Sequence, residues 1–143
     1  MTAADLPGVL AIERTSFSSP WSIQCFQSEL SSHYAYPIVV WQPEEPRVLG
    51  YLCSWIVLGE CHLLNLAVHP ERRRRGLATH LLDFLFRICR RKSVHDYYLE
   101  VRRSNTVAIS LYRKHGFTMC GVRRGYYTDT REDAIVMRRR DRW

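Results

Sequence analysis

Apolar residues recur at helical spacing in four segments of the chain. In the first segment Leu6, Val9 and Ile12 share one face, Asp5 stands at the N-cap position, and Pro7 lies in the first turn. The pattern predicts helices over residues 5–17, from 21 or 22 to about 30, over about 15 residues from 77, and over 105–115.

Strand-like segments lie between and after these helices. They cover residues 36–41, 48–58, 61–68, 97–101, 118–123 and 134–139. Residues 42–46 are rich in turn formers and predict a hairpin loop. Residues 61–68 are almost continuously apolar, which is typical of a strand covered on both faces. The order of elements predicts a mixed α/β sheet with helices on both faces.

Length and composition are those of one globular domain. The chain has 143 residues, of which 46% are hydrophobic and 24% charged, and this predicts a single domain over residues 1–143. No apolar run approaches the roughly 18–20 residues of a membrane span. The N-terminus has neither the basic nor the apolar region of a signal peptide. We therefore expect a cytoplasmic protein with no membrane contact.

The cysteines do not indicate a metal site. None forms a C-x-x-C pair, and no cluster of Cys and His has the spacing of zinc ligands. We expect all five to be small buried hydrophobic residues, and we expect no metal. They are Cys25, Cys53, Cys61, Cys89 and Cys120.

The charge balance indicates a polyanionic neighbour. Lys and Arg number 21 against 14 Asp and Glu, so the formal net charge is +7. Much of the arginine lies in runs at residues 72–75, 87–92 and 138–142. A phosphorylated cofactor, a nucleic acid and an acidic protein surface would each suit this balance, and charge alone does not choose among them.

One basic loop offers a specific anion site. The apolar segment 61–68 is followed by a loop that opens a long helix with the sequence Arg73-Arg74-Arg75-Gly76-Leu77-Ala78. The unpartnered N–H groups and the dipole of such a helix start favour a phosphate or pyrophosphate. The loop lacks the Gly-Lys-Ser/Thr ending of a P-loop and the three glycines of a dinucleotide fold. The alternative is a solvated basic loop that only caps the helix.

The loop does not stand alone, because further motifs accompany it. Arg-x-x-Gly-x-Ala after an apolar strand resembles the acetyl-CoA signature of the GCN5-related N-acetyltransferase superfamily. The second half of that signature resembles residues 99–105 and 108–117 of this chain. Residues 123–127 and 131–137, with Trp21 after Ser-Ser-Pro, resemble the RimI branch, the ribosomal-protein-alanine N-acetyltransferases. The resemblance covers nearly the whole chain.

This resemblance implies a fold and an acetyl-CoA site. The implied sheet is mostly antiparallel, and one strand splays from its neighbour where the acetyl-pantetheine arm binds. Backbone groups of that strand would face the arm, the basic loop would wrap the pyrophosphate, and the start of the next helix would contact the cofactor. The implied cofactor-binding residues are Leu66, Ala67, Val68, Arg73, Arg74, Arg75, Gly76, Leu77, Ala78, Thr79 and Asn105.

Two residues match the proton-transfer positions of the family. The resemblance implies that Glu100 is the general base and Tyr112 the general acid. An amine must lose a proton to attack a thioester, and the leaving thiolate benefits from gaining one. The alternatives are that Glu100 pairs with a nearby arginine such as Arg102 and that Tyr112 is a core residue.

The resemblance also implies an acceptor. Trp21, Tyr126 and Tyr127 would border a groove for a peptide N-terminus, although the two tyrosines could equally be ordinary strand aromatics. The implied substrate is the N-terminal alanine of a small-subunit ribosomal protein, and the basic surface favours weak association with the ribosome or RNA. A lysine, a small amine or an antibiotic is the alternative acceptor, and a basic nucleic-acid-binding module is the alternative function.

One feature departs from the family pattern. Members of the superfamily usually have an edge strand before the first helix, and here only a few residues precede that helix. We therefore expect the strand to be short or missing, with an upstream start of the chain as the alternative.

Overall fold

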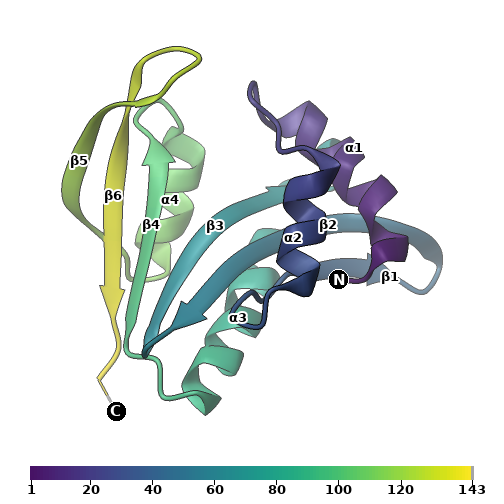
Figure 1. Ribbon diagram of the computed structural model, residues 1–143, viewed down its shortest axis with the longest axis horizontal. Helices are drawn as coiled ribbons and strands as arrows, with labels where there is room; N and C mark the ends of the chain where they lie inside the picture. The colour runs from purple at the N-terminus through teal and green to yellow at the C-terminus, as the bar shows by residue number, and fades with distance from the viewer. Residues whose placement is uncertain (143) are drawn as a thin grey trace.

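The computed structural model describes residues 1–142 and all of their side chains except those of Glu45 and Pro46. Residue 143 of the expected domain lies outside the described residues. Six strands form one sheet in the order β1-β2-β3-β4-β6-β5, and β3 and β4 are its parallel pair. The mixed, mostly antiparallel sheet is confirmed (Figure 1). Its strands are β1 Ile38–Gln42, β2 Glu45–Val57, β3 Glu60–Val68, β4 Asp96–Arg102, β5 Thr118–Tyr127 and β6 Glu132–Arg140.

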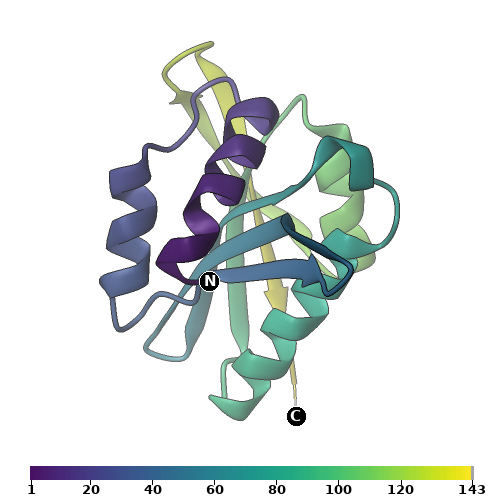
Figure 2. The ribbon, with the colours of Figure 1, turned by 90° about the vertical axis from the view of Figure 1, so that its right-hand side faces the viewer.

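Helices cover both faces of the sheet, as expected (Figures 1 and 2). On one face, α1 (Leu6–Ser16) and α2 (Ile23–Ser31) pack through a cluster that includes Val9, Ile12 and Phe26. On the other face, α3 (Leu77–Arg91) and α4 (Thr106–Lys114) pack through a cluster that includes Leu82 and Tyr112. None of these helices combines the length and apolar composition that crossing a membrane requires.

The sheet opens between β3 and β4. Their pairing begins with Glu60 opposite Asp96 and ends with Leu63 opposite Leu99. Next along β3, Leu64 has no partner in β2, because the register shifts between Cys53 and Ser54. Such a bulge bends and twists its strand. Beyond it, β3 and β4 diverge (Figure 1), and this is the implied splay.

The apolar segment around this bulge is covered on both faces, as its composition predicts. Leu64 packs against the α1–α2 cluster, and Leu66 packs against the α3–α4 cluster. The bulge therefore lies between the two layers of helices.

Several boundaries differ from the sequence expectation. The expected loop over residues 42–46 is too long, because Gln42 pairs with Glu45 and the hairpin turn is residues 43–44. The strand expected to end at residue 123 continues to Tyr127, past a register shift at which Gly125 takes a left-handed φ of 59°. In both cases backbone pairing extends a strand through residues whose local preference favours a turn. Along residues 1–142, a 3₁₀ turn (Ala3–Asp5) leads directly into α1.

The cysteines divide into two groups. Cys53, Cys61 and Cys89 are buried, as expected, whereas Cys25 and Cys120 are exposed. The expectation of burial is wrong for these two, because Cys25 lies in the first turn of α2, away from the core, and Cys120 lies on the outermost strand. Within residues 1–142, no group of three or more His, Cys, Asp or Glu side chains is placed to hold a metal ion.

Candidate active site

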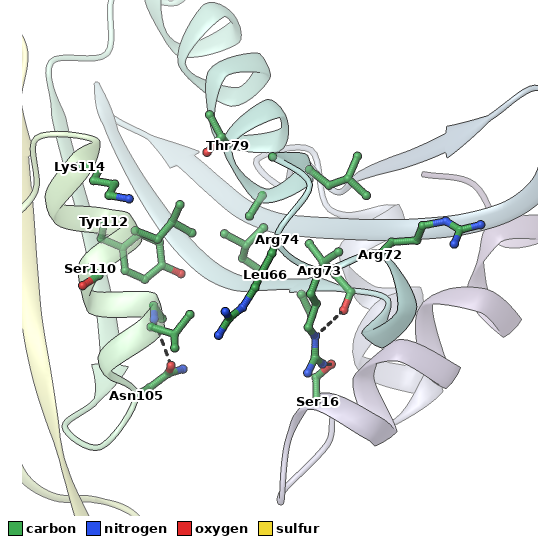
Figure 3. Close-up of a pocket in the computed structure, with 18 of the residues that line it drawn as sticks. Ser16, Leu66, Arg72, Arg73, Arg74, Thr79, Asn105, Ser110, Tyr112 and Lys114 are labelled. Carbon is green, nitrogen blue, oxygen red and sulfur yellow. Dashed lines mark hydrogen bonds between the residues drawn. The ribbon is translucent and has the colours of Figure 1, made fainter.

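A cleft of about 1080 Å³ lies where β3 leaves β4. Its walls are the C-terminal half of β3, the loop and first turn leading into α3, the inner face of α4, and the end of α1 (Figure 3). Ten of the eleven expected cofactor-binding residues line it, and Arg75 does not. The ten are Leu66, Ala67, Val68, Arg73, Arg74, Gly76, Leu77, Ala78, Thr79 and Asn105.

The start of α3 leaves its backbone amides free for a ligand. Gly76 is the N-cap, and no side chain caps the helix. Its φ of 77° lies in the left-handed region, and a Cβ at this position would meet nothing within 4 Å. Glycine is therefore favoured here by the backbone conformation rather than by crowding. The N–H groups of the first turn belong to Leu77, Ala78 and Thr79, which line the cleft, and they have no acceptor within the helix, which suits an anion.

The arginines of the basic loop have different roles. Arg73 donates from Nε to the carbonyl of Val68 at 3.1 Å and from Nη2 to Ser16 Oγ at 3.1 Å, so it ties the loop to β3 and to α1. Arg74 extends into the cleft from a left-handed backbone with φ of 61° (Figure 3). Arg74 is therefore the loop arginine best placed to meet an anion at the start of α3.

Helix α4 contributes the opposite wall. Asn105 caps it, because its Oδ1 accepts the N–H of Ala108 at 3.1 Å. Thr106, Ser110 and Lys114 also line the cleft, and sequence reasoning missed them. Their spacing of four residues, which places them along one helix face, is the signal that could have found them.

Tyr112 combines burial with access to the cleft. Its side chain is 8% exposed, and its ring packs against Phe117 with centroids 5.8 Å apart. Its hydroxyl points into the cleft (Figure 3). Burial, with a smaller contribution from nearby Tyr127, raises the pKa of Tyr112 above its usual value. The hydroxyl therefore keeps its proton at neutral pH and can donate it.

Glu100 lies at the opening of the sheet. It follows Leu99, the last residue of β4 that pairs with β3. Leu99 and Val101 are buried toward α3 and α4, so alternation directs Glu100 to the α1–α2 face of the sheet. Its side chain does not line the cleft around Tyr112, and it lies beside the point where the pairing of β3 with β4 ends.

Glu100 pairs with an arginine, as the alternative interpretation of the sequence expected, but the partner is Arg123 and not Arg102. Arg123 Nε lies 3.4 Å from Glu100 Oε1, whereas Arg102 is engaged by Asp129. The Glu100 and Arg123 side chains are 29% and 59% exposed. An ion pair this exposed is weak, so Arg123 does little to fix the Glu100 carboxylate in place.

The aromatic residues expected at the acceptor groove lie outside the cleft. Trp21 packs on Phe26 with centroids 5.3 Å apart, and its backbone N–H donates to Glu13 Oε1 at 2.9 Å. Tyr126 is 47% exposed and makes an edge contact with Tyr127 at 5.1 Å. Burial raises the pKa of Tyr127 to about 12.

Comparison with known proteins identifies the family. The model of the acetyltransferase (GNAT) family matches residues 6–117. A ribosomal protein bS18-alanine N-acetyltransferase of Escherichia coli (strain K12) is 36% identical over 139 residues, which are 96% of this chain and 92% of the relative.

Solved structures agree with this match. The ribosomal-protein-S18-alanine N-acetyltransferase from Escherichia coli superposes with a TM-score of 0.88 and 35% identity, over 98% of this chain and 90% of that one. Ard1 from Thermoplasma volcanium superposes with a TM-score of 0.88 and 25% identity, over 100% and 95% of the two chains. The resemblance found in the motifs is thus confirmed over almost the full sequence, and the chain belongs to the acetyltransferase (GNAT) family.

Proposed function

We propose that this protein transfers the acetyl group of acetyl-CoA to the α-amine of an N-terminal alanine, on a ribosomal protein of the small subunit. The relatives named for this reaction support the acceptor. The observation that carries the proposal is the opening between β3 and β4, with the uncapped start of α3 on one side and Glu100 on the other.

The cleft fits the parts of acetyl-CoA. The pyrophosphate would lie at the first turn of α3, where free amides and Arg74 offer hydrogen bonds and positive charge. The acetyl-pantetheine arm would run along β3 at Leu66, Ala67 and Val68, past Asn105. The thioester would then lie near the point where β3 and β4 part.

The chain's own residues would carry the proton transfers. Glu100 would take a proton from the incoming ammonium, through a water, so that the free amine forms the new C–N bond. Tyr112 would donate its hydroxyl proton to the sulfur as the C–S bond breaks. An α-amine has a reference pKa of about 7.7–8.0 against about 10.4 for lysine, so mild base catalysis suffices at neutral pH.

An acceptor assay tests the proposal. A peptide that begins with alanine should be acetylated on its α-amine, and the same peptide blocked at that amine but carrying free lysines should be nearly inert. Mass spectrometry of the products locates the acetyl group. Preferential labelling of lysine would replace our proposal with the alternative acceptor class.

A thermal shift tests the cofactor site. A ligand at a hundredfold excess over its Kd stabilises the native state by about 2.7 kcal/mol, so acetyl-CoA should raise Tm by roughly 5–10 °C. Gly76→Val should abolish this rise, because valine resists the left-handed φ of 77° at the start of α3.

The matched control is Gly59→Val. Gly59 has a φ of 82°, and a Cβ there would also meet nothing within 4 Å. It lies just before β3, at the end of that strand away from the cleft. It should lower the Tm of the free protein but keep the rise with acetyl-CoA. If wild-type protein shows no rise at millimolar acetyl-CoA, the site is misassigned.

A further inference from the structure

The bulge reverses the alternation of side chains along β3. Before the bulge, Leu63 packs in the α3–α4 cluster. Leu64 packs against the α1–α2 cluster, and Asn65 faces the same way, because it pairs with Cys53 of that cluster. Leu66 then returns to the α3–α4 side. Two successive side chains, those of Leu64 and Asn65, therefore share one face of the sheet, as expected where an extra residue enters a strand.

Glu13 of α1 binds both strands beside this bulge. Its Oε2 accepts a hydrogen bond from Asn65 Nδ2 at 2.9 Å and another from the hydroxyl of Tyr51. Tyr51 lies in β2 and pairs with Ala67, two residues beyond Asn65 on β3. The exposed fractions of Glu13 and Asn65 are 1% and 9%. The buried carboxylate thus holds the strand pair at the point where β3 lines the cleft.

The hydrogen bond between Glu13 and Asn65 forms in one register only. A shift of β3 by one residue would turn each side chain past the bulge to the other face of the sheet. Asn65 would then enter the apolar α3–α4 cluster, where its amide would lose this partner, and Leu66 would meet the carboxylate instead. A buried amide without a hydrogen bond costs free energy, and so does the loss of a donor to a buried carboxylate. The pair therefore favours the bulged register over a regular one.

The register decides which backbone groups of β3 face the cleft. Past Leu63, β3 has no partner in β4, so part of its N–H and C=O groups turn toward the gap. Leu66, Ala67 and Val68 line the cleft there, along the path proposed for the acetyl-pantetheine arm. A shift of one residue moves a strand by about 3.3 Å, whereas a misplacement of about 1 Å can already cost about 10²-fold in rate. The geometry of the transfer is therefore sensitive to this register.

We propose that Glu13 is a positioning residue for the transfer reaction: through Asn65 and Tyr51 it fixes the register of the β3 bulge and thereby places the thioester of acetyl-CoA. Glu13 lies outside the cleft, so it acts only through these neighbours. The inference rests on the proposed function, because it assigns the bulged strand to the acetyl end of the cofactor. It adds a buried residue of α1 that touches no reacting group.

Two variants that keep a side chain of similar size test the pair. Glu13→Gln keeps one oxygen for the N–H of Trp21 and turns an NH2 group toward the amide of Asn65, so that two donors meet. Asn65→Leu removes the donor and suits either face of the sheet, so it no longer opposes a shift. Each should lower kcat for the alanine peptide by about 10–10²-fold and change its KM little. Glu13→Gln combined with Asn65→Asp reverses the direction of the hydrogen bond and should restore most of kcat.

An infrared measurement observes the thioester directly and needs no acceptor. Acetyl-CoA with an isotope label on the thioester carbonyl carbon is bound to the protein, and its carbonyl stretching band is compared with that of the free cofactor. Backbone N–H groups of β3 that point at the carbonyl polarise it and should lower this frequency. We expect a shift to lower frequency in wild type and a smaller shift in Glu13→Gln and Asn65→Leu. Both variants should keep the Tm rise with acetyl-CoA, which depends on the start of α3.

Glu29→Gln is the matched control. Glu29 is a second buried carboxylate, 7% exposed, and it accepts from Trp55 Nε1 at 2.9 Å, on the side of the bulge where β3 still pairs with β4. This variant should lower the Tm of the free protein but keep the kcat and the carbonyl band of wild type. Tyr51→Phe removes one hydroxyl only and should change kcat and the band in the same direction as Glu13→Gln, but less. It decides the test alone if the stronger variants do not fold.

The possible results separate the register from general stability. The kcat and carbonyl band of wild type in every folded variant of Glu13, Asn65 and Tyr51 would overturn the inference. Equal losses in Glu29→Gln would also overturn it, because the effect would then follow stability and not the register. A wild-type protein that shows the band shift but does not acetylate the α-amine would instead overturn the proposed acceptor and leave this inference standing.

Discussion

Replacing Glu100 with glutamine should lower kcat for the alanine peptide by about 10²–10⁴-fold, the usual contribution of general base catalysis. The amide keeps the shape of the side chain but accepts no proton from the incoming ammonium. The affinity for acetyl-CoA should change little, because Glu100 lies outside the cleft that holds the expected cofactor residues. Steady-state kinetics and the acetyl-CoA thermal shift measure the two effects separately.

The pH profile of the same variant sharpens the test. For wild-type protein, kcat/KM should rise with pH as the α-amine, with a reference pKa of about 8, loses its proton. Glu100→Gln should recover part of its activity at high pH, where free amine is abundant. Glu60→Gln is the matched control, because Glu60 is an exposed carboxylate at the other end of β3, where its side chain contacts His62. Full activity of Glu100→Gln from pH 6 to 9 would exclude Glu100 as the base.

Removing the Tyr112 hydroxyl tests the proposed acid in the same way. Tyr112→Phe keeps the ring packed on Phe117 and should lower kcat by about 10²–10⁴-fold. Tyr97→Phe is the matched control, since Tyr97 is fully buried in the same cluster and its hydroxyl has no hydrogen-bond partner within residues 1–142. That control should keep full activity, because it removes a hydroxyl that contacts no reacting group.

Local patterns predicted the parts of the site that local structure creates. The helical spacing of apolar residues predicted that α3 begins at Leu77, and the basic loop before it predicted that Gly76 stands at the helix start. Alternation along β4 correctly separated Glu100 from Leu99 and Val101. Each of these features depends on residues within one or two helical turns or within a single strand, so local sequence patterns are enough to predict it.

Features that depend on distant residues were not predictable in this way. The bulge at Leu64 arises from pairing with β2, and no residue in that apolar run signals it. Ser18 and Asp129 are both ordinary loop residues in sequence, and only the fold brings them within 2.6 Å. The ionic partner of Glu100 is likewise set by neighbouring strands, which bring Arg123 closer than Arg102.

Glu13 is the clearest case of a residue whose role the sequence conceals. It lies in α1 among apolar residues, and its side chain is 1% exposed. Its Oε1 accepts the N–H of Trp21 at 2.9 Å, and its Oε2 accepts from Asn65 Nδ2 at 2.9 Å and from the hydroxyl of Tyr51. One carboxylate therefore joins the α1–α2 loop to β2 and to the bulged part of β3.

The pH dependence of stability should reveal the burial of this carboxylate. Burial raises the pKa of Glu13, which outweighs the opposing hydrogen bonds from Trp21 and Asn65. The folded state thus holds this proton more tightly than the unfolded state. The contribution of Glu13 to stability is full below the unfolded pKa and falls as pH rises through the folded pKa. We expect the free energies of unfolding of wild type and Glu13→Gln, measured with urea, to differ by an amount that changes with pH between the unfolded and the folded pKa of Glu13. A difference that stays constant over this pH range would contradict the raised pKa.

Glu13→Ala should lower the free energy of unfolding by about 3–5 kcal/mol, because it leaves three donors, two of them on buried side chains, without an acceptor and opens a cavity. That is a large part of the roughly 5–15 kcal/mol that stabilises a typical domain. Glu29→Ala is the comparison, since Glu29 is 7% exposed but accepts from a single donor, Trp55 Nε1 at 2.9 Å. It should cost only about 1–3 kcal/mol. Equal losses in the two variants, measured by urea unfolding at one pH, would show that the number of orphaned donors does not set the cost.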